Sequence, residues 1–319
     1  MKNKLAMMLG LFALSFVNAK TEKDSISRFT FQKMVLFEDD CDACGCSANG
    51  GSMGFSSVFS NNFVGIRYFN QAYRSKDGIF NNSPWVQERF NTIQVWARIP
   101  VTERIQVSAL IPYHFHTRER AAGDENIEGL GDITVLGMYT VYQTHRDSTI
   151  YTHKLFAGSG FKAPTGKFNV ENNKGSVNPG FQVGTGSWDY LLTAEYVVKR
   201  KKIGLNSMLN YTFKTENKKL YQFGDQLNYG STLFYLLDWK KLQVVPQLGF
   251  AGEVYKENKQ YDETVPDSAG AVFFTKFGFE AGRNNFSLGV NVMLPVDQNL
   301  SNEKVEAKYR WAMNLNYSL

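Results

Sequence analysis

The three cysteines of this chain could bind a metal ion. Cys41, Cys44 and Cys46 lie close together, and three aspartates stand among or just before them. Thiolates at this spacing can converge on one soft ion, and they favour Cu(I), Zn(II) or iron–sulfur centres. The neighbouring carboxylates add negative charge that attracts cations. Copper and zinc are therefore the candidate ions for a site formed by these three thiols.

The same cysteines could instead form a disulfide, because an exported chain folds in an oxidising compartment. A bridge between Cys41 and Cys46 is sterically easier than one between Cys44 and Cys46, and an odd thiol remains in either case. Lipidation or another use is a third alternative. The residues leave these three alternatives open.

A second candidate metal site is the pair His114 and His116. Residues two apart on a strand share one face, so both imidazoles lie opposite the apolar Ile111 and Tyr113. Such a pair can bind a metal ion, or it can simply line a polar lumen. We favour lining.

The N-terminus predicts export. Lys2 and Lys4 precede an apolar run from Leu5 to Val17, and a small-residue cleavage site ends at Ala19. We expect residues 1–19 to be a signal peptide. The chain then divides into an N-terminal segment, 20–61, which carries the cysteines and lies in the periplasm or the lumen, and a barrel, 62–319.

Composition points to an all-β protein. Of the 319 residues, 43% are hydrophobic and 14% aromatic, which is too rich for a disordered chain. Only the N-terminal apolar run approaches the length of a membrane helix, so a helical bundle is excluded. The net charge of +5 is spread along the chain and does not indicate nucleic-acid binding.

Residues alternate between apolar and polar over about twelve segments, as in strands that face two different solvents. The predicted strands are 62–72, 87–99, 104–116, 131–143, 149–163, 181–198, 203–215, 224–238, 242–255, 269–281, 286–297 and 305–319. Short connections alternate with longer loops, which is typical of a transmembrane antiparallel β-barrel. We therefore predict a barrel of about 12 strands in the outer membrane of a Gram-negative bacterium, in contact with outer-membrane lipids and the outer-membrane assembly machinery.

Three short motifs follow one another along the predicted strands and loops. They contain Gly129, Gly131 and Asp132, then Pro164, Thr165 and Gly166, then Gly184, Gly186 and Asp189. The glycines allow tight bending where a loop enters the barrel wall, and the aspartates are expected to point inward or cap loops. In order and spacing this trio resembles the outer-membrane transporter family associated with phenol meta-pathway degradation, over roughly residues 87–319. The resemblance implies a passive barrel porter, linked in several members to aromatic or other hydrophobic compounds.

The predicted function is therefore passive passage of a small-molecule solute through the barrel. Glu195 and Glu253 fall on lumen-facing positions and, with Arg98, are expected to set a weak charge preference. No catalytic residue is expected, because a barrel lipase would need a Ser and a His near the outer leaflet and no convincing pair is present. The alternative is a metal-handling protein that uses the cysteine cluster. The oligomeric state is not set by the sequence.

Overall fold

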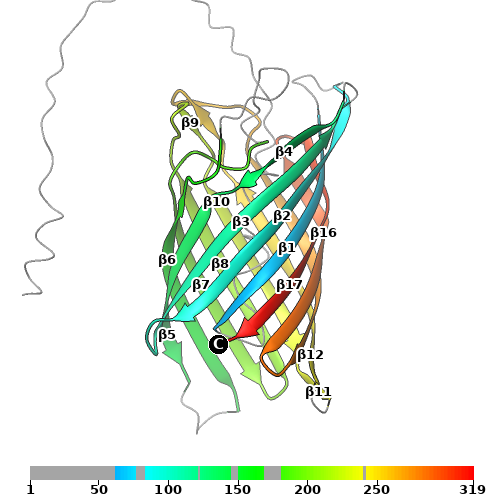
Figure 1. The fold of residues 1–319 in the computed structure, drawn as a ribbon. Coiled ribbons are helices and arrows are strands. Elements are labelled where there is room, and N and C mark those ends of the chain that lie inside the picture. Colours follow the sequence, from blue (N-terminus) through cyan, green and yellow to red (C-terminus); the bar gives the residue numbers. More distant parts are fainter. Residues whose placement is uncertain (1–61, 77–82, 121–122, 145–149, 169–180, 240–241) are drawn as a thin grey trace, which may run out of the picture. The chain divides into compact units, whose positions relative to one another are not determined.

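The structure, a computed structural model, describes residues 62–76, 83–120, 123–144, 150–168, 181–239 and 242–319. Every regular element in these ranges is a β-strand, and the longest of them build one barrel (Figure 1). The wall consists of β1 (Phe63–Lys76), β2 (Trp85–Pro100), β3 (Ile105–Glu119), β4 (Glu125–Leu130), β5 (Ile133–Gln143), β6 (Thr152–Ala163), β7 (Asp189–Arg200), β8 (Ile203–Lys214), β10 (Gln226–Tyr235), β11 (Leu237–Trp239), β12 (Leu242–Tyr255), β15 (Gly270–Arg283), β16 (Phe286–Leu300) and β17 (Val305–Ser318). No helix in these ranges is long and apolar enough to cross a membrane.

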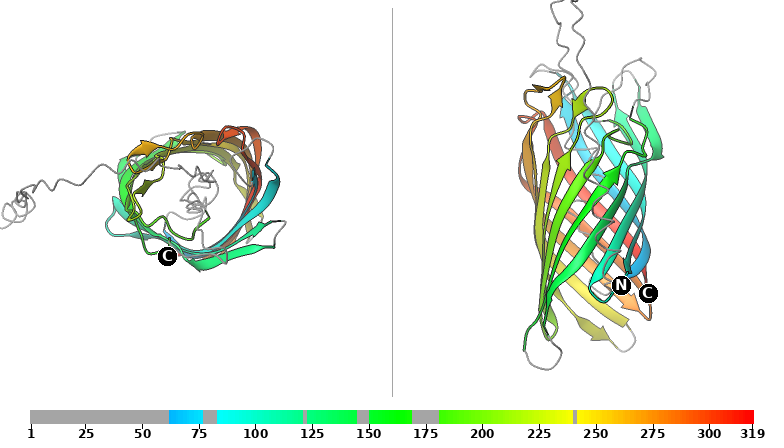
Figure 2. Two further views of the ribbon diagram at one scale, coloured as in Figure 1. Left: turned by 90° about the horizontal axis from the view of Figure 1, so that it is seen from above. Right: turned by 90° about the vertical axis from the view of Figure 1, so that its left-hand side faces the viewer.

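The wall closes on itself. These elements form one 14-stranded sheet in which β4 and β5 continue one wall strand and β10 and β11 another, so the barrel has 14 − 2 = 12 strands. β1 pairs with β17 from Phe63↔Ser318 to Ser75↔Val305, and β10 pairs with β12, which leaves no gap between the first and last strands. All pairings are antiparallel, and an end-on view shows the ring (Figure 2). The predicted all-β barrel is confirmed.

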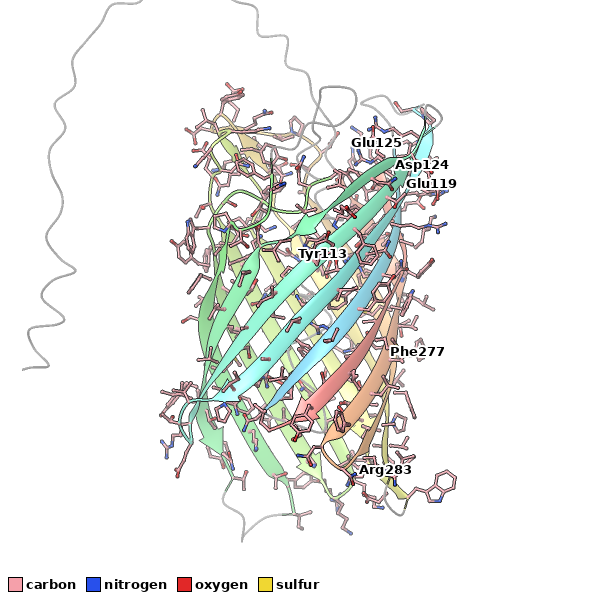
Figure 3. The ribbon with its side chains drawn as sticks, in the orientation of Figure 1. Tyr113, Glu119, Asp124, Glu125, Phe277 and Arg283 are labelled. Carbon is pink, nitrogen blue, oxygen red and sulfur yellow. The ribbon has the colours of Figure 1, made fainter. Side chains whose placement is uncertain are left out.

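Alternation along each strand separates an apolar outer face from a mixed interior. On β1, Val64 and Ile66 point outward and are 40% and 55% exposed. The next residue, Arg67, points inward and is only 4% exposed. Tyr113 and Phe277 project from the outer face in the same way (Figure 3). An apolar outer band is what lipid contact requires.

Three predicted boundaries were wrong. The expected loop 117–130 is largely strand, because β3 runs to Glu119 and pairs with β4, for example Arg118↔Glu125. The expected strand 181–198 begins only at Asp189, since the residues before it fold inward and hydrogen-bond to side chains. Segments expected as loops also contain a small sheet of β9 (Tyr221–Gln222), β13 (Lys259–Gln260) and β14 (Glu263–Thr264).

The long and short connections lie at opposite ends of the barrel. β1 starts beside the end of β17, at the end that carries the two-residue connections between β7 and β8 and between β15 and β16. We call this the short-turn end, and the opposite one the long-loop end. The predicted signal peptide 1–19 and the segment 20–61 with Cys41, Cys44 and Cys46 lie outside the described residues.

Candidate functional site in the barrel interior

The interior contains two apolar clusters separated by polar side chains. The long-loop cluster includes Phe69, Tyr73, Phe90, Phe181 and Phe274, with Ile127 of β4 packed against it. The short-turn cluster consists of Phe63, Trp96, Leu110, Leu136, Met138 and Phe156. Both clusters are almost fully buried. Aromatic and aliphatic surface inside a barrel favours contact with apolar groups over water.

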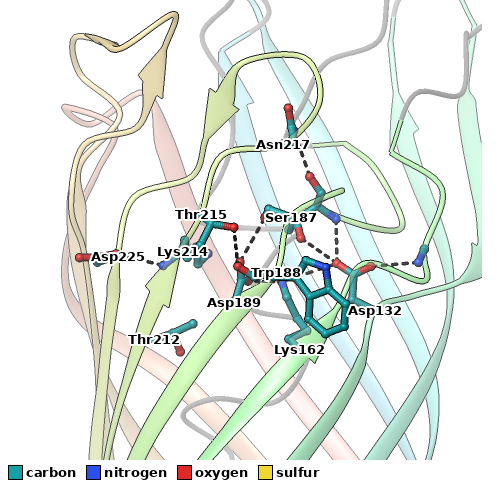
Figure 4. A network of polar contacts seen from close by, with 12 residues as sticks. Asp132, Lys162, Ser187, Trp188, Asp189, Thr212, Lys214, Thr215, Asn217 and Asp225 are labelled. Carbon is teal, nitrogen blue, oxygen red and sulfur yellow. Dashed lines mark hydrogen bonds and ion pairs between the residues drawn. The ribbon is translucent and has the colours of Figure 1, made fainter. Parts of the chain in front are cut away.

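The three sequence motifs meet at one place, where the chain folds inward between β6 and β7 (Figure 4). Asp132 is buried and accepts hydrogen bonds from the backbone N–H of Gly166 at 2.9 Å and of Thr185 at 2.8 Å. The Thr185 hydroxyl donates to the same carboxylate at 2.8 Å. Thr165 bridges the strand break, since its hydroxyl donates to the Gly131 carbonyl at 2.8 Å. We call this arrangement the loop clasp.

A lysine and a second aspartate complete the loop clasp. Lys162 of β6 forms an ion pair with Asp189 at 2.6 Å and lies 3.6 Å from Asp132. Ser187 donates to Asp189 at 3.1 Å, and all of these side chains are buried. Each buried carboxylate is thus compensated by charge and by donors, as burial of an ion requires. Asp132 and Asp189 are thus both buried, with their carboxylates bound by residues of the inward fold.

Glycines are needed in the loop clasp because backbones approach closely there. A Cβ on Gly184 would lie 2.6 Å from the carbonyl carbon of Gly166, and one on Gly131 would lie 2.2 Å from Nε2 of His114. Gly186 has φ of +71°, and its Cβ would meet the Phe168 ring. Gly129 is the next-to-last residue of β4 and lies near Val183. The remaining predicted motif residue, Pro164, directly follows β6.

The predicted histidine pair lies inside the barrel beside the loop clasp. His114 and His116 are both buried, with ring centroids 4.9 Å apart, and Nδ1 of His114 contacts the Thr92 hydroxyl at 2.8 Å. The His116 ring packs 4.9 Å from Phe90. In the described ranges, no group of three or more His, Cys, Asp and Glu side chains could hold a metal ion.

Ion pairs connect strands that are not neighbours in the wall. Arg98 of β2 reaches Glu195 of β7 at 3.3 Å, and Asn206 donates to the same carboxylate at 2.9 Å. Arg310 of β17 binds Glu253 of β12 with both terminal nitrogens, at 2.7 and 2.8 Å. Both predicted glutamates therefore face the lumen. These pairs connect wall strands that are separated by three and by two others.

Sequence reasoning missed the partners of these carboxylates. Lys162 begins the second sequence motif and Thr185 lies within the third, but neither was assigned a role, and Arg310 was not singled out. Lys162 alternates inward on β6, so strand periodicity could have indicated its position. Arg310 and Glu253 are far apart in sequence, and only closure of the barrel brings them together.

Asp225 orders the long-loop end just before β10. It accepts hydrogen bonds from the Lys214 backbone N–H at 3.0 Å and from the Tyr211 hydroxyl at 2.9 Å, and Lys256 lies 3.2 Å away. Burial alone would raise the pKa of Asp225, but these hydrogen bonds and the ammonium outweigh burial and lower it.

Residues 85–314 match the family described as "Putative MetA-pathway of phenol degradation". This match spans 314 − 85 + 1 = 230 of the 319 residues. The chain belongs to this family. No curated protein matches the sequence.

The solved structure of an outer membrane channel shows the same type of barrel. The COG4313 outer membrane channel from Pseudomonas putida F1 is similar with a TM-score of 0.63 at 14% identity, covering 82% of this chain and 97% of that one. The beta domain of the Bordetella autotransporter Brka reaches a TM-score of 0.47 at 9% identity, covering 82% and 100%. In fold, the barrel therefore resembles Gram-negative outer-membrane channels, as the sequence predicted.

Proposed function

We propose that this protein is a channel of the Gram-negative outer membrane that lets small apolar solutes pass down their gradient. The observation that carries the proposal is the long-loop cluster, a set of aromatic side chains held inside a closed barrel. A channel for ions alone needs polar lining, whereas an apolar solute gains free energy at each apolar surface that it contacts. Passage of this kind uses no catalytic group and no cofactor.

The interruption of the fourth wall strand supports an apolar route. β5 pairs on both edges, with β3 and β6, whereas in the described part of the chain β4 hydrogen-bonds to β3 alone. Ile127 of β4 packs on the long-loop cluster directly behind this edge. Apolar solute could therefore reach the cluster near the interruption. The loop clasp holds the chain in place beside it.

The proposal is tested by uptake in a porin-deficient Gram-negative host. Cells that express the protein should take up radiolabelled naphthalene faster than cells with empty vector, and an uncoupler should leave the initial rate unchanged. Permeabilising the outer membrane should abolish the difference between the two strains. Equal uptake by both strains, or uptake that needs the proton-motive force, would contradict a passive channel.

A further inference from the structure

We propose that the lumen from the middle of β15 to the short-turn end selects for anions, so that among apolar solutes the channel prefers those with an anionic head group such as a carboxylate. The inference rests on the proposed function and adds a charge to the apolar solute class. It is carried by three lysines, Lys154, Lys199 and Lys276, which face the lumen and form no ion pair with a carboxylate of the described ranges.

The first like-charge pair lies in the middle of the lumen. Lys276 occupies an inward position of β15, and its only described polar contact is the Thr232 hydroxyl at 3.4 Å. Arg67 of β1 faces the same lumen, where its guanidinium donates to Gln94 at 2.7 Å. No carboxylate of the described ranges forms an ion pair with Lys276. Cations that face one lumen all gain from an anion placed within it.

The second like-charge pair lies near the short-turn end. Lys154 of β6 and Lys199 of β7 alternate inward with Phe156 and Glu195, and the two ammonium groups repel each other. Neither lysine forms an ion pair with a described carboxylate. The repulsion again favours an anion at this depth of the lumen.

Summed charge distinguishes the two halves of the interior. Toward the short turns, five cations face inward against two carboxylates, which gives 5 − 2 = +3; the residues are Arg67, Arg98, Lys154, Lys199 and Lys276 against Glu195 and Glu280. Toward the long loops, charges are matched in pairs such as Arg118 with Glu88 at 2.6 Å and Arg310 with Glu253. The excess of positive charge is therefore confined to one half.

The rim outside this half is basic as well. Arg200 at the end of β7 and the turn residues Lys201 and Lys202 lie there, and Arg283 lies at the same end (Figure 3). Of these, Lys202 forms an exposed ion pair with Asp238 at 3.3 Å. A cleft lined by charge of one sign concentrates ions of the opposite sign. The positive charge of the rim and that of the lumen therefore both attract anions.

The test measures the reversal potential of the purified full-length chain in planar bilayers under a potassium chloride gradient. The wild type should prefer chloride. Lys276→Gln should lower the chloride-to-potassium permeability ratio about sevenfold, because one unit charge roughly 7 Å from the ion path in water favours chloride by about RT and disfavours potassium by as much. The Lys154→Gln/Lys199→Gln double variant should lower it as well. Lys219→Gln removes an equal charge from an exposed site at the long-loop end and should leave the ratio unchanged.

Added solutes identify the anionic group. Benzoate should block the chloride current of the wild type more strongly than neutral benzyl alcohol, and inorganic phosphate tests whether a phosphate serves equally well. If no ion current is seen, cellular uptake of radiolabelled benzoate and benzyl alcohol is measured instead. Lys276→Gln should then slow the uptake of benzoate and leave the uptake of benzyl alcohol unchanged.

The outcomes separate the two proposals. If naphthalene enters cells but the lysine variants leave permeability and benzoate uptake at wild-type values, the anion inference is wrong and the channel stands. If neither ions nor naphthalene nor benzoate passes, the proposed function is wrong and the inference fails with it. Preference for potassium in the wild type would also overturn the inference.

Discussion

Replacing Asp132 should release the chain segment that the loop clasp holds inside the barrel. The carboxylate accepts three hydrogen bonds of 2.8 to 2.9 Å, from Gly166 N–H, Thr185 N–H and the Thr185 hydroxyl. In Asp132→Ala these three donors lose their acceptor in a buried site. Lys162 keeps its 2.6 Å ion pair with Asp189, so the lysine is not left without a counter-ion.

The size of the effect follows from those contacts. A hydrogen bond to a charged group contributes about 1.5–3 kcal/mol, so three would give roughly 4.5–9 kcal/mol if they were independent. They share one carboxylate, and released donors can bind water, so the sum overestimates the loss. We expect local opening to become about 4 kcal/mol easier, which corresponds to roughly a thousandfold lower amide protection.

Hydrogen exchange measures this loss directly, through the amides of Gly166 and Thr185 in protein reconstituted in lipid. The amide protection of Asp132→Asn should lie between that of the wild type and that of Asp132→Ala, because the Asn side chain retains one acceptor oxygen but carries a donor in place of the other. Thr185→Ser keeps the hydroxyl and serves as the control with wild-type protection. If both amides stay as protected in Asp132→Ala as in the wild type, the loop clasp does not depend on Asp132 and the reasoning is refuted.

Three further results are expected. Gly184→Ala would place a Cβ 2.6 Å from the facing glycine backbone and should cost about 1–3 kcal/mol in urea unfolding from vesicles, whereas Gly137→Ala, with its nearest contact at 3.7 Å, should cost far less. Glu195→Gln removes a lumen carboxylate beside Arg98 and should raise the chloride-to-potassium permeability ratio about sevenfold in reversal-potential measurements; a shift toward potassium would contradict this. Because folding lowers the pKa of Asp225, its contribution to stability is full above the ordinary aspartate pKa and is lost as the pH falls through the lowered one. The gap in melting temperature between wild type and Asp225→Asn should therefore persist at neutral pH and close only in strong acid; a gap that closes near neutrality would refute it.

The wall of the barrel was predictable because its physics is local. The alternation of apolar and polar residues, such as Ile111, Tyr113 and His114, indicates which face of a strand meets lipid, and it is visible within the sequence of a single strand. The motif aspartates were predictable for a similar reason, since glycine-rich bends beside a carboxylate are visible in short windows of sequence.

Contacts across the lumen were not predictable from the sequence. Arg98 and Glu195 come from strands separated by three others, and their meeting depends on the register of every strand between them. The start of β7 was misjudged because the residues before Asp189 look strand-like but are bound by the Asp132 side chain. Hydrogen bonds to a distant side chain leave no periodic signal.

The most direct test of the central claim places a thiol at two adjacent positions of β7, after the three native cysteines are replaced by serine. Thr193 faces the lumen and is 7% exposed, whereas Leu192 faces outward and is 53% exposed. If solute crosses through the barrel interior, a bulky maleimide on Thr193→Cys should stop naphthalene uptake, and the same label on Leu192→Cys should leave it unchanged. Uptake that is equally insensitive to both labels would contradict passage through the lumen.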